Sequence, residues 1–181
     1  ADEEELIIVK EGKLSVTING KTQELGQGSV ALALPGDQHG FNNTSESTTT
    51  YYVIKYKSKL PLNAERGKTG GGSFMIDWNN VAFTPHDKGG VRRFFDRSTA
   101  LMSRFEMHVT TLNEGLKSHD PHTHAAEEII LMIKGDGQMQ IGQNFYRTST
   151  GDLVYVSSLA PHAIKNTGRG SCMYFAFTWV P

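Results

Sequence analysis

The chain contains an internal repeat with one constant offset of 123 residues. EELIIVKEG at 4–12 matches EEIILMIKG at 127–135, and GSVALALPGDQHGFNN at 28–43 matches GDLVYVSSLAPHAIKN at 151–166. Identical residues coincide at five spaced positions: Glu5 with Glu128, Gly12 with Gly135, Gly28 with Gly151, His39 with His162, and Asn43 with Asn166. No gap is needed between the first pair and the last. Because self-similarity at a fixed offset marks a duplicated structural unit, the sequence predicts two copies of one fold.

The repeated unit has the two-residue periodicity of β-strands. Leu14, Val16 and Ile18 alternate with polar residues and lead into Asn19-Gly20, the preferred pair for a type I′ hairpin turn. The second copy has Gly142-Gln143 there, which suits a type II′ turn. Further strand-like runs lie at 29–34, 50–57, 105–112, 128–134, 138–146, 152–157 and 171–180. With no convincing amphipathic helix, we predict an all-β protein.

The length and a glycine-rich segment suggest how the two copies are divided. A chain of 181 residues can hold one sizeable core or two small ones. The segment 58–73, SKLPLNAERGKTGGGS, has no periodicity and is typical of a flexible connection. We therefore expect a first β-barrel over 1–57, a linker over 58–73 and a second barrel over 74–181.

Composition narrows the class of partner. The 18 Lys and Arg residues balance 19 Asp and Glu residues, so no basic field is available for nucleic acid. No apolar run approaches the roughly 18 residues that cross a bilayer, and the opening ADEEELIIVKEG lacks the pattern of a signal peptide. The single cysteine, Cys172, excludes an internal disulfide and a cysteine-rich zinc site. We expect a soluble chain with a small-molecule ligand, no membrane or nucleic-acid partner, and an undetermined compartment.

The motifs of the second copy resemble those of the cupin superfamily, G-x5-H-x-H-x3/4-E-x6-G and G-x5-P-x-G-x2-H-x3-N. The matching positions are Gly115, His122, His124, Glu128 and Gly135, followed by Gly151, His162 and Asn166. There are three departures: six residues separate Gly115 from His122, Ser157 replaces the usual proline, and Ala160-Pro161 replace the glycine region. These departures affect the shape of loops and leave the number of ligands unchanged.

The resemblance implies two jelly-roll-like barrels, hence a bicupin, with a metal centre in the second. The stretch MHVTTLNEG at 107–115 is also loosely similar to ureidoglycine aminohydrolases, which are bicupins with their metal in the second barrel. Cupins of this kind include isomerases, lyases, decarboxylases, dioxygenases and aminohydrolases. The resemblance thus implies a metal-dependent protein without fixing its reaction.

The residues themselves indicate the same metal site. His122 and His124 are two apart, so we expect them on one face of a strand, with Glu128 after a short turn and His162 on a distant strand. Three imidazoles and a carboxylate suit one divalent transition metal, which could be manganese, iron, nickel, copper or zinc. An isolated H-x-H pair would equally fit the polar face of an exposed strand. The remote histidine and the repeat favour the metal.

The first copy has an incomplete version of this set. The position aligned with His124 is Ala1, and the position aligned with His122 precedes the given sequence, so only Glu5 and His39 remain. Either the natural chain is longer, or the first barrel was never a metal site. We favour the first interpretation, with the first barrel truncated at its N-terminus.

Other residues are weaker candidates. His108 alternates with Glu106 and lies on a polar strand face that fits solvent better than a pocket. Arg92 and Arg93 could clamp an anionic substrate, although such clusters usually form a solvated face. We expect His86 in a solvated turn, and His119 at the mouth of the barrel. No catalytic residue can be assigned.

Two functions are open. We favour a metalloenzyme acting on a small polar metabolite with carboxylate, keto or hydroxyl oxygens, which the ion would polarise as a Lewis acid. The alternative is a non-catalytic cupin that binds or stores a sugar or an acid. We also expect a homodimer, because the apolar face formed by Met173, Phe175, Phe177 and Trp179 needs covering.

Overall fold

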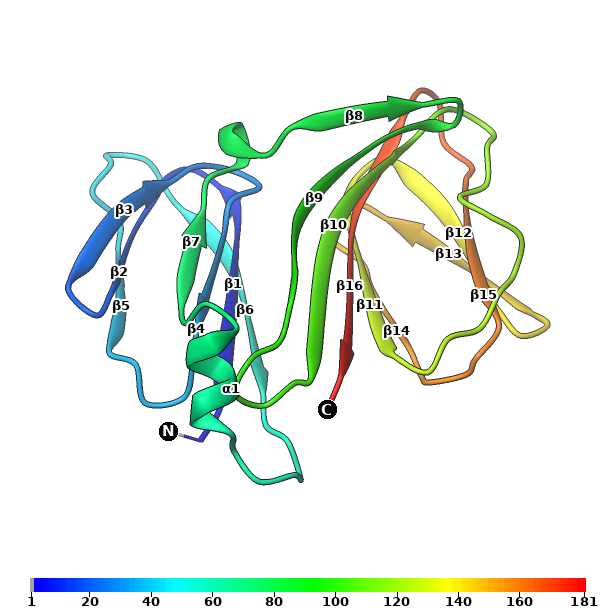
Figure 1. The fold of residues 1–181 in the computed structure, drawn as a ribbon. Helices are drawn as coiled ribbons and strands as arrows, with labels where there is room; N and C mark the ends of the chain where they lie inside the picture. Colours follow the sequence, from blue (N-terminus) through cyan, green and yellow to red (C-terminus); the bar gives the residue numbers. More distant parts are fainter. Residues whose placement is uncertain (1) are drawn as a thin grey trace. The chain divides into compact units, whose positions relative to one another are not determined.

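The protein is built from β-strands, as seen in a computed structural model that describes residues 2–181 (Figure 1). Among these residues the helices are α1 (Ala64–Thr69) and the 3-10 helix η1 (Trp78–Asn80). No helix within residues 2–181 is long and apolar enough to cross a bilayer. The predicted all-β fold is therefore confirmed.

The duplication is visible strand by strand. The first copy contains β1 (Glu4–Glu11), β2 (Leu14–Ile18), β3 (Lys21–Leu25), β4 (Val30–Ala33), β5 (His39–Asn42) and β6 (Thr50–Tyr56). The second contains β11 (Glu127–Lys134), β12 (Asp136–Ile141), β13 (Asn144–Ser149), β14 (Leu153–Val156), β15 (His162–Asn166) and β16 (Cys172–Val180). Strands β1 and β11 differ by 123 positions at both ends, and so do β4 and β14.

The pairing register repeats with the same offset. Glu5 pairs with Ala33 on β4, and Glu128 pairs with Val156 on β14. Both β1 and β11 also carry a register shift at the same place, before Glu11 and before Lys134. Since a slip of one residue would exchange the two faces of a strand, equivalent side chains keep equivalent directions in the two copies.

The predicted hairpin turns are confirmed. Asn19 and Gly20 both have positive φ, at 48° and 77°, as a type I′ turn requires. In the second copy Gly142 has φ 59°, as expected for the first central residue of a type II′ turn. The predicted strand 138–146 is divided by this turn into β12 and β13.

The chain forms two compact units. The first comprises the residues up to Val81, Arg97–Ser103 and Pro181, with the sheets β6-β1-β4-β7 and β3-β2-β5, where β7 is Phe74–Ile76. The second comprises Ala82–Asp96 and Arg104–Val180, with the sheets β14-β11-β16-β10-β9-β8 and β13-β12-β15. In each unit, strands of both sheets contribute buried apolar side chains to one core.

The second unit contains three strands with no counterpart among the described residues of the first. They are β8 (Phe83–His86), β9 (Gly89–Arg97) and β10 (Arg104–Leu112), and they extend the sheet beyond β16. In the first unit β6 is an edge strand, whereas its counterpart β16 in the second unit pairs with β10. The missing opening strands of the first barrel stay a prediction.

Part of the segment predicted as a flexible linker is ordered. Helix α1 begins after Asn63, whose side chain accepts a hydrogen bond from the Arg66 N–H at 2.9 Å. The Arg66 guanidinium donates to the carbonyls of Thr99 and Ala100, at 2.8 and 3.2 Å. A helix of six residues is too short to show a periodic pattern, and the contacts that hold this one come from residues remote in sequence. Sequence periodicity therefore does not predict it. Residues 74–81 and 97–103 also group with the first unit.

The apolar face of β16 is covered within the chain, so the expectation that it needs a partner chain is wrong. Phe175 and Phe177 are 0% and 2% exposed, and Trp179 is 8% exposed. Phe94 on β9 contacts Phe175, with ring centroids 5.6 Å apart, so part of this cover comes from a strand that the pattern did not predict. The homodimer itself stays a prediction, now without this support.

Removing the side chain of Asn166 should destabilise the second unit. This fully buried amide donates to the carbonyls of Leu112 and Gly170 and accepts from the Gly168 N–H. Its counterpart Asn43 makes similar local bonds but is exposed. In Asn166→Ala the buried backbone groups that bonded to the amide would have neither a protein partner nor water. The substitution should therefore lower the free energy of unfolding by about 2–3 kcal/mol.

The matched control is Asn43→Ala, which should cost less than about 1 kcal/mol because water can replace its bonds. Urea denaturation followed by circular dichroism measures both changes. Equal losses in the two variants would contradict the role assigned to burial.

Candidate metal centre

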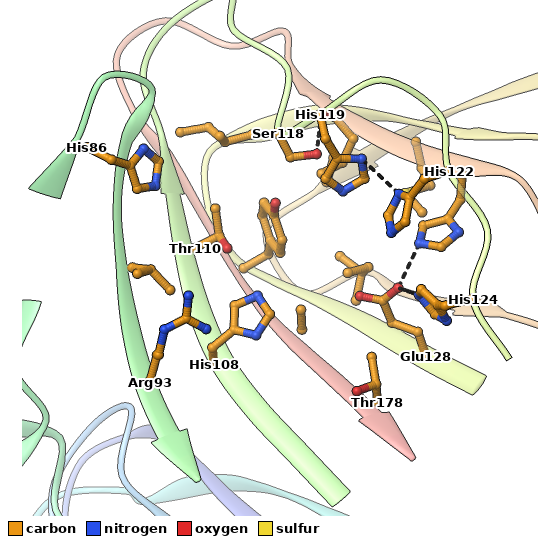
Figure 2. Close-up of a pocket in the computed structure, with 18 residues that line it drawn as sticks. His86, Arg93, His108, Thr110, Ser118, His119, His122, His124, Glu128 and Thr178 are labelled. Atoms are coloured by element: carbon orange, nitrogen blue, oxygen red, sulfur yellow. Dashed lines mark hydrogen bonds and ion pairs between the residues drawn. The ribbon is translucent and has the colours of Figure 1, made fainter. Parts of the chain in front are cut away.

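A cavity of about 370 Å³ lies in the second unit and contains most of the histidines of the chain (Figure 2). Six histidines line it: His86, His108, His119, His122, His124 and His162. Buried apolar residues such as Ile130, Met139 and Ile164 also line it. Such a cavity is of the size that holds small metabolites.

The backbone places His122 beside His162. The His122 N–H donates to the His162 carbonyl at 3.2 Å, and the His162 N–H donates to the His122 carbonyl at 3.0 Å. This is an isolated bridge, so the expected regular strand through His122 and His124 is wrong. Pro121 has no N–H with which to continue a ladder. The segment is instead held by the bridge and by the Leu159 N–H, which donates to the His124 carbonyl at 2.9 Å.

The side chain of Glu128 brings two of the imidazoles together. Strand β11 directs this carboxylate into the cavity, where the residue is only 7% exposed. Its Oε2 lies 2.8 Å from His162 Nε2 and 3.2 Å from His124 Nε2. One carboxylate oxygen thus faces two ring nitrogens that come from different segments. Figure 2 labels Glu128 and His124 of this group.

The other nitrogen of each of these rings is fixed by the backbone. His124 Nδ1 donates to the Ala126 carbonyl at 2.8 Å, and His162 Nδ1 donates to the Ala160 carbonyl at 2.9 Å. Because a carbonyl can only accept, the hydrogen of a neutral ring stays on Nδ1 and the Nε2 lone pair faces the cavity. Candidate ligand atoms of His122, His124 and His162 all lie within 4.8 Å of one another. The arrangement fits a single cation.

The electrostatics of the cluster follow from its burial and its hydrogen bonds. Burial opposes ionisation of Glu128, but the hydrogen bond and charge of His162, with those of His124, outweigh it and lower the pKa of Glu128. For His162, burial favours the neutral ring, yet the hydrogen bond to Glu128 outweighs it and raises the pKa. Burial and the neighbouring histidines lower the pKa of His122. The same Nε2 of His162 therefore holds a proton toward Glu128 or offers a lone pair to a cation.

The structure places the remaining predicted histidines around this cluster. His119 stands next to His122, with the two Nδ1 atoms 3.0 Å apart and the ring centroids 4.1 Å apart. His86, expected in solvent, lines the cavity although its side chain is 39% exposed. Of the two environments left open for His108, the structure shows the pocket and not the favoured solvent, because strand β10 directs this residue into the cavity.

The two neighbouring arginines on β9 are separated by strand alternation. Arg93 lines the cavity. Arg92 does not, and its guanidinium carbon lies 5.6 Å from the centroid of the Phe83 ring. Of the two arginines predicted as pocket residues, the structure therefore brings only Arg93 to the site.

In the first unit, the counterpart of the cluster holds a lysine. His39 Nε2 lies 3.5 Å from Glu5 Oε1, as the repeat predicts for the partners of Glu128 and His162. Lys55 Nζ lies 3.2 Å from Glu5 Oε2. Lys55 pairs in register with Glu5 on β1, at the position that Thr178 occupies opposite Glu128. An ammonium group thus already neutralises the carboxylate of the first copy.

Sequence reasoning missed several hydroxyl groups of the cavity. Tyr174 hydrogen-bonds to Thr110 and Ser118, and burial raises its pKa. Its position alternates with the apolar residues Met173 and Phe175, so the pattern that predicted an apolar face also placed Tyr174 on the opposite face. The sequence pattern does not show that this opposite face of the strand lines a cavity, so Tyr174 was not predicted as a pocket residue.

Comparisons with known proteins agree with this architecture. A family model described as a cupin domain matches residues 1–55 and 108–180. The (S)-ureidoglycine aminohydrolase of Arabidopsis thaliana is 22% identical over 177 residues, which are 97% of this chain and 57% of that protein. The chain therefore spans little more than half the length of this curated relative.

Solved structures show the same fold at low sequence identity. A putative glyoxylate-induced protein of Pseudomonas aeruginosa superposes with a TM-score of 0.76 at 21% identity, covering 99% of this chain and 67% of that chain. A point mutant of Bacillus subtilis oxalate decarboxylase superposes with a TM-score of 0.75 at 15% identity, covering 99% and 64%. At these identities the likeness establishes the fold alone.

In protein treated with a chelator, His162 should titrate at a higher pH than His122. The reason is that Glu128 stabilises the protonated ring of His162, whereas burial and neighbouring imidazoles disfavour protonation of His122. The pair raises the pKa of His162 and lowers that of Glu128, so its stabilisation is greatest between these two values. It is lost as the pH rises through the pKa of His162 and as the pH falls through that of Glu128. Imidazole nitrogen NMR across a pH range of about 4–9, which brackets the ordinary histidine pKa, would measure both rings.

The matched variant is Glu128→Gln, in which His162 should titrate at a lower pH than in the wild type. An unchanged pKa of His162 in that variant would contradict the assigned cause.

Proposed function

Because the chain belongs to the cupin family, we propose that His122, His124, Glu128 and His162 hold one divalent transition-metal ion at a catalytic centre. The observation that carries the proposal is the convergence of two Nε2 atoms on one buried carboxylate oxygen, with both Nδ1 atoms tied to backbone carbonyls. Backbone hydrogen bonds of this kind orient the imidazoles of metal sites. They can stay in place when an ion replaces the proton.

The donor set suits first-row transition metals. Three neutral imidazoles and one carboxylate are borderline nitrogen and oxygen donors, and manganese, iron, nickel, copper and zinc all accept them. Four protein ligands leave up to two positions of an octahedron for water or a ligand. When bound, the ion would supply Lewis acidity to an oxygen of that ligand.

The protein residues would bind and orient a small polar molecule in the cavity. The hydroxyl groups of Thr110 and Thr178 and the imidazole of His108 line the cavity with the four proposed ligands. The names of two relatives refer to ureidoglycine and oxalate. Small acids with keto, hydroxyl or amide oxygens are therefore the first compounds to test for turnover. The alternative, binding without catalysis, would give the same metal content but no turnover.

We expect a single ion in each chain. In the first unit only Glu5 and His39 correspond to the proposed ligands, and Lys55 already neutralises Glu5. Two ligands beside an ammonium group offer a divalent cation a poor site, since metal sites of this kind use four ligands.

Replacing His162 by Ala should remove the ion. Loss of a residue that hydrogen-bonds to a metal ligand weakens metal affinity by roughly 10- to 100-fold. Loss of a ligand itself should weaken the metal affinity by at least as much. The metal content of purified protein, measured by inductively coupled plasma mass spectrometry, should fall from near one ion per chain to a small fraction. Circular dichroism should still report a folded protein.

The matched control is His39→Ala, at the repeat-related position of the first unit. Its metal content should equal that of the wild type. If His39→Ala removed the ion and His162→Ala did not, the roles of the two units would be reversed.

A further inference from the structure

The acidic side chains around the cavity of the second unit are already paired. Glu106 Oε1 lies 2.8 Å from His108 Nδ1. Asp96 receives both arms of the Arg104 guanidinium, at 2.8 Å each. Glu128 is held by imidazoles, as described above. Each of these carboxylates thus already has a hydrogen-bond partner other than Arg93.

Arg93 is a cation without such a partner. It lines both the cavity and an adjoining recess formed by residues that include Asp96, Arg104 and Glu106. Within residues 2–181, Arg93 has no ion pair or side-chain hydrogen bond, although two acids line the same recess. Its side chain is solvent-exposed and points into the cavity from β9 in Figure 2. A guanidinium directed into a polar cavity, with the nearby acids occupied, favours an anion from solution.

His108 stands beside Arg93 on the same wall. The two residues line the cavity and the recess together, and Figure 2 shows both on the wall away from His122, His124 and Glu128. The hydrogen bond from His108 to Glu106 uses Nδ1, so Nε2 is the nitrogen that remains for a ligand. It donates to a carboxylate when the ring carries hydrogen on both nitrogens, as an imidazolium does. The Glu106 side chain is only 12% exposed, so this hydrogen bond holds the ring in a largely water-free place.

We propose that Arg93 and His108 form an anion subsite that binds one carboxylate of a small ligand, whose second oxygen group reaches the proposed metal centre. This inference rests on the proposed function and names its substrate class. The ligand would be a short carboxylic acid with a further carboxylate, hydroxyl or keto oxygen. A guanidinium presents two parallel N–H donors that match the two oxygens of a carboxylate.

The size and the charge of the cavity agree with this class. At about 370 Å³ the cavity is near the lower end of the range for small-molecule sites. With a divalent ion on one wall and Arg93 on the other, the paired acids leave an excess of positive charge. An anion with oxygens at both ends would meet both cations, whereas a neutral ligand of the same size would gain little from either charge.

The test is calorimetric titration of malonate into metal-loaded protein. Arg93→Gln should weaken malonate binding by about tenfold or more, since hydrogen bonds to charged groups are worth about that factor. His108→Ala should weaken it by a smaller but measurable factor. The matched control is Arg92→Gln, which removes the same charge from the neighbouring position outside the cavity and should change affinity less than about twofold. Arg93 is exposed, so Arg93→Gln should fold, and its metal content verifies that the proposed centre is intact.

Several results would overturn the subsite. One is equal affinity of wild type and Arg93→Gln for malonate, and another is equal loss in Arg93→Gln and Arg92→Gln, which would indicate only a general charge effect. Failure of malonate, oxalate and lactate to bind metal-loaded wild type at millimolar concentration would also overturn it. An unchanged affinity in His108→Ala would remove His108 from the subsite.

The same experiment separates this inference from the proposed function. If purified protein held no metal and could not be loaded, the proposed centre would fail. Metal-free protein would then be titrated with malonate. Binding that depends on Arg93 and not on Arg92 would support the subsite alone, and its absence would overturn both.

Discussion

A buried carboxylate must be paired, and this requirement governs both copies of the repeat. Glu128 and Glu5 occupy the same register position on β11 and β1, and their side chains are 9% and 13% exposed. An unpaired charge in such a place would be strongly destabilising. In the second unit the partners are imidazoles, which can exchange a proton for a metal ion. In the first unit the partners are His39 and the ammonium group of Lys55, and an ammonium group has no lone pair to offer a metal ion.

The backbone around Glu5 and Glu128 is paired in the same way in the two copies, so the different partners of these carboxylates result from side chains alone. The bounds of β1 and β11, their register and their register shifts follow one offset of 123 residues, so the two carboxylates face equivalent neighbours. The difference lies in single positions, such as Lys55 against Thr178. One fold thus presents a proposed metal centre in one copy and an internal ion pair in the other, without a change of backbone pairing. This is the general relation of fold to function, in which the site and not the architecture determines the chemistry.

The features that depend on short-range pattern and on the repeat could be predicted from the sequence. The hairpin turn at Asn19-Gly20, the strands shared by the two copies and the meeting of Glu128 with His162 follow from spacing and the repeat, whereas β7, β8 and β9 were not predicted. Features that depend on which remote segment lies opposite were missed. Helix α1 is held by Arg66 against the carbonyls of Thr99 and Ala100, which lie 33 and 34 residues away in sequence.

The sequence also could not predict which polar strand faces line the cavity and which face solvent. Alternation separates Arg92 from Arg93 and places His108 with Glu106, but it cannot say which face meets a cavity. Likewise, the aromatic residues of β16 resemble a surface that needs a partner chain, while Phe94 and other residues of the same chain already cover them. The segment from Pro121 to His124 adopts an irregular path because a single bridge replaces a strand.

The most direct test of the metal centre is anomalous diffraction at transition-metal absorption edges, on crystals of protein purified without chelator. We predict one anomalous peak per chain within about 2.0–2.3 Å of His122, His124, Glu128 and His162, and none between Glu5 and His39. A peak at Glu5 and His39 with none in the second unit would contradict the assignment. So would a second unit without a peak in protein that elemental analysis finds to contain metal.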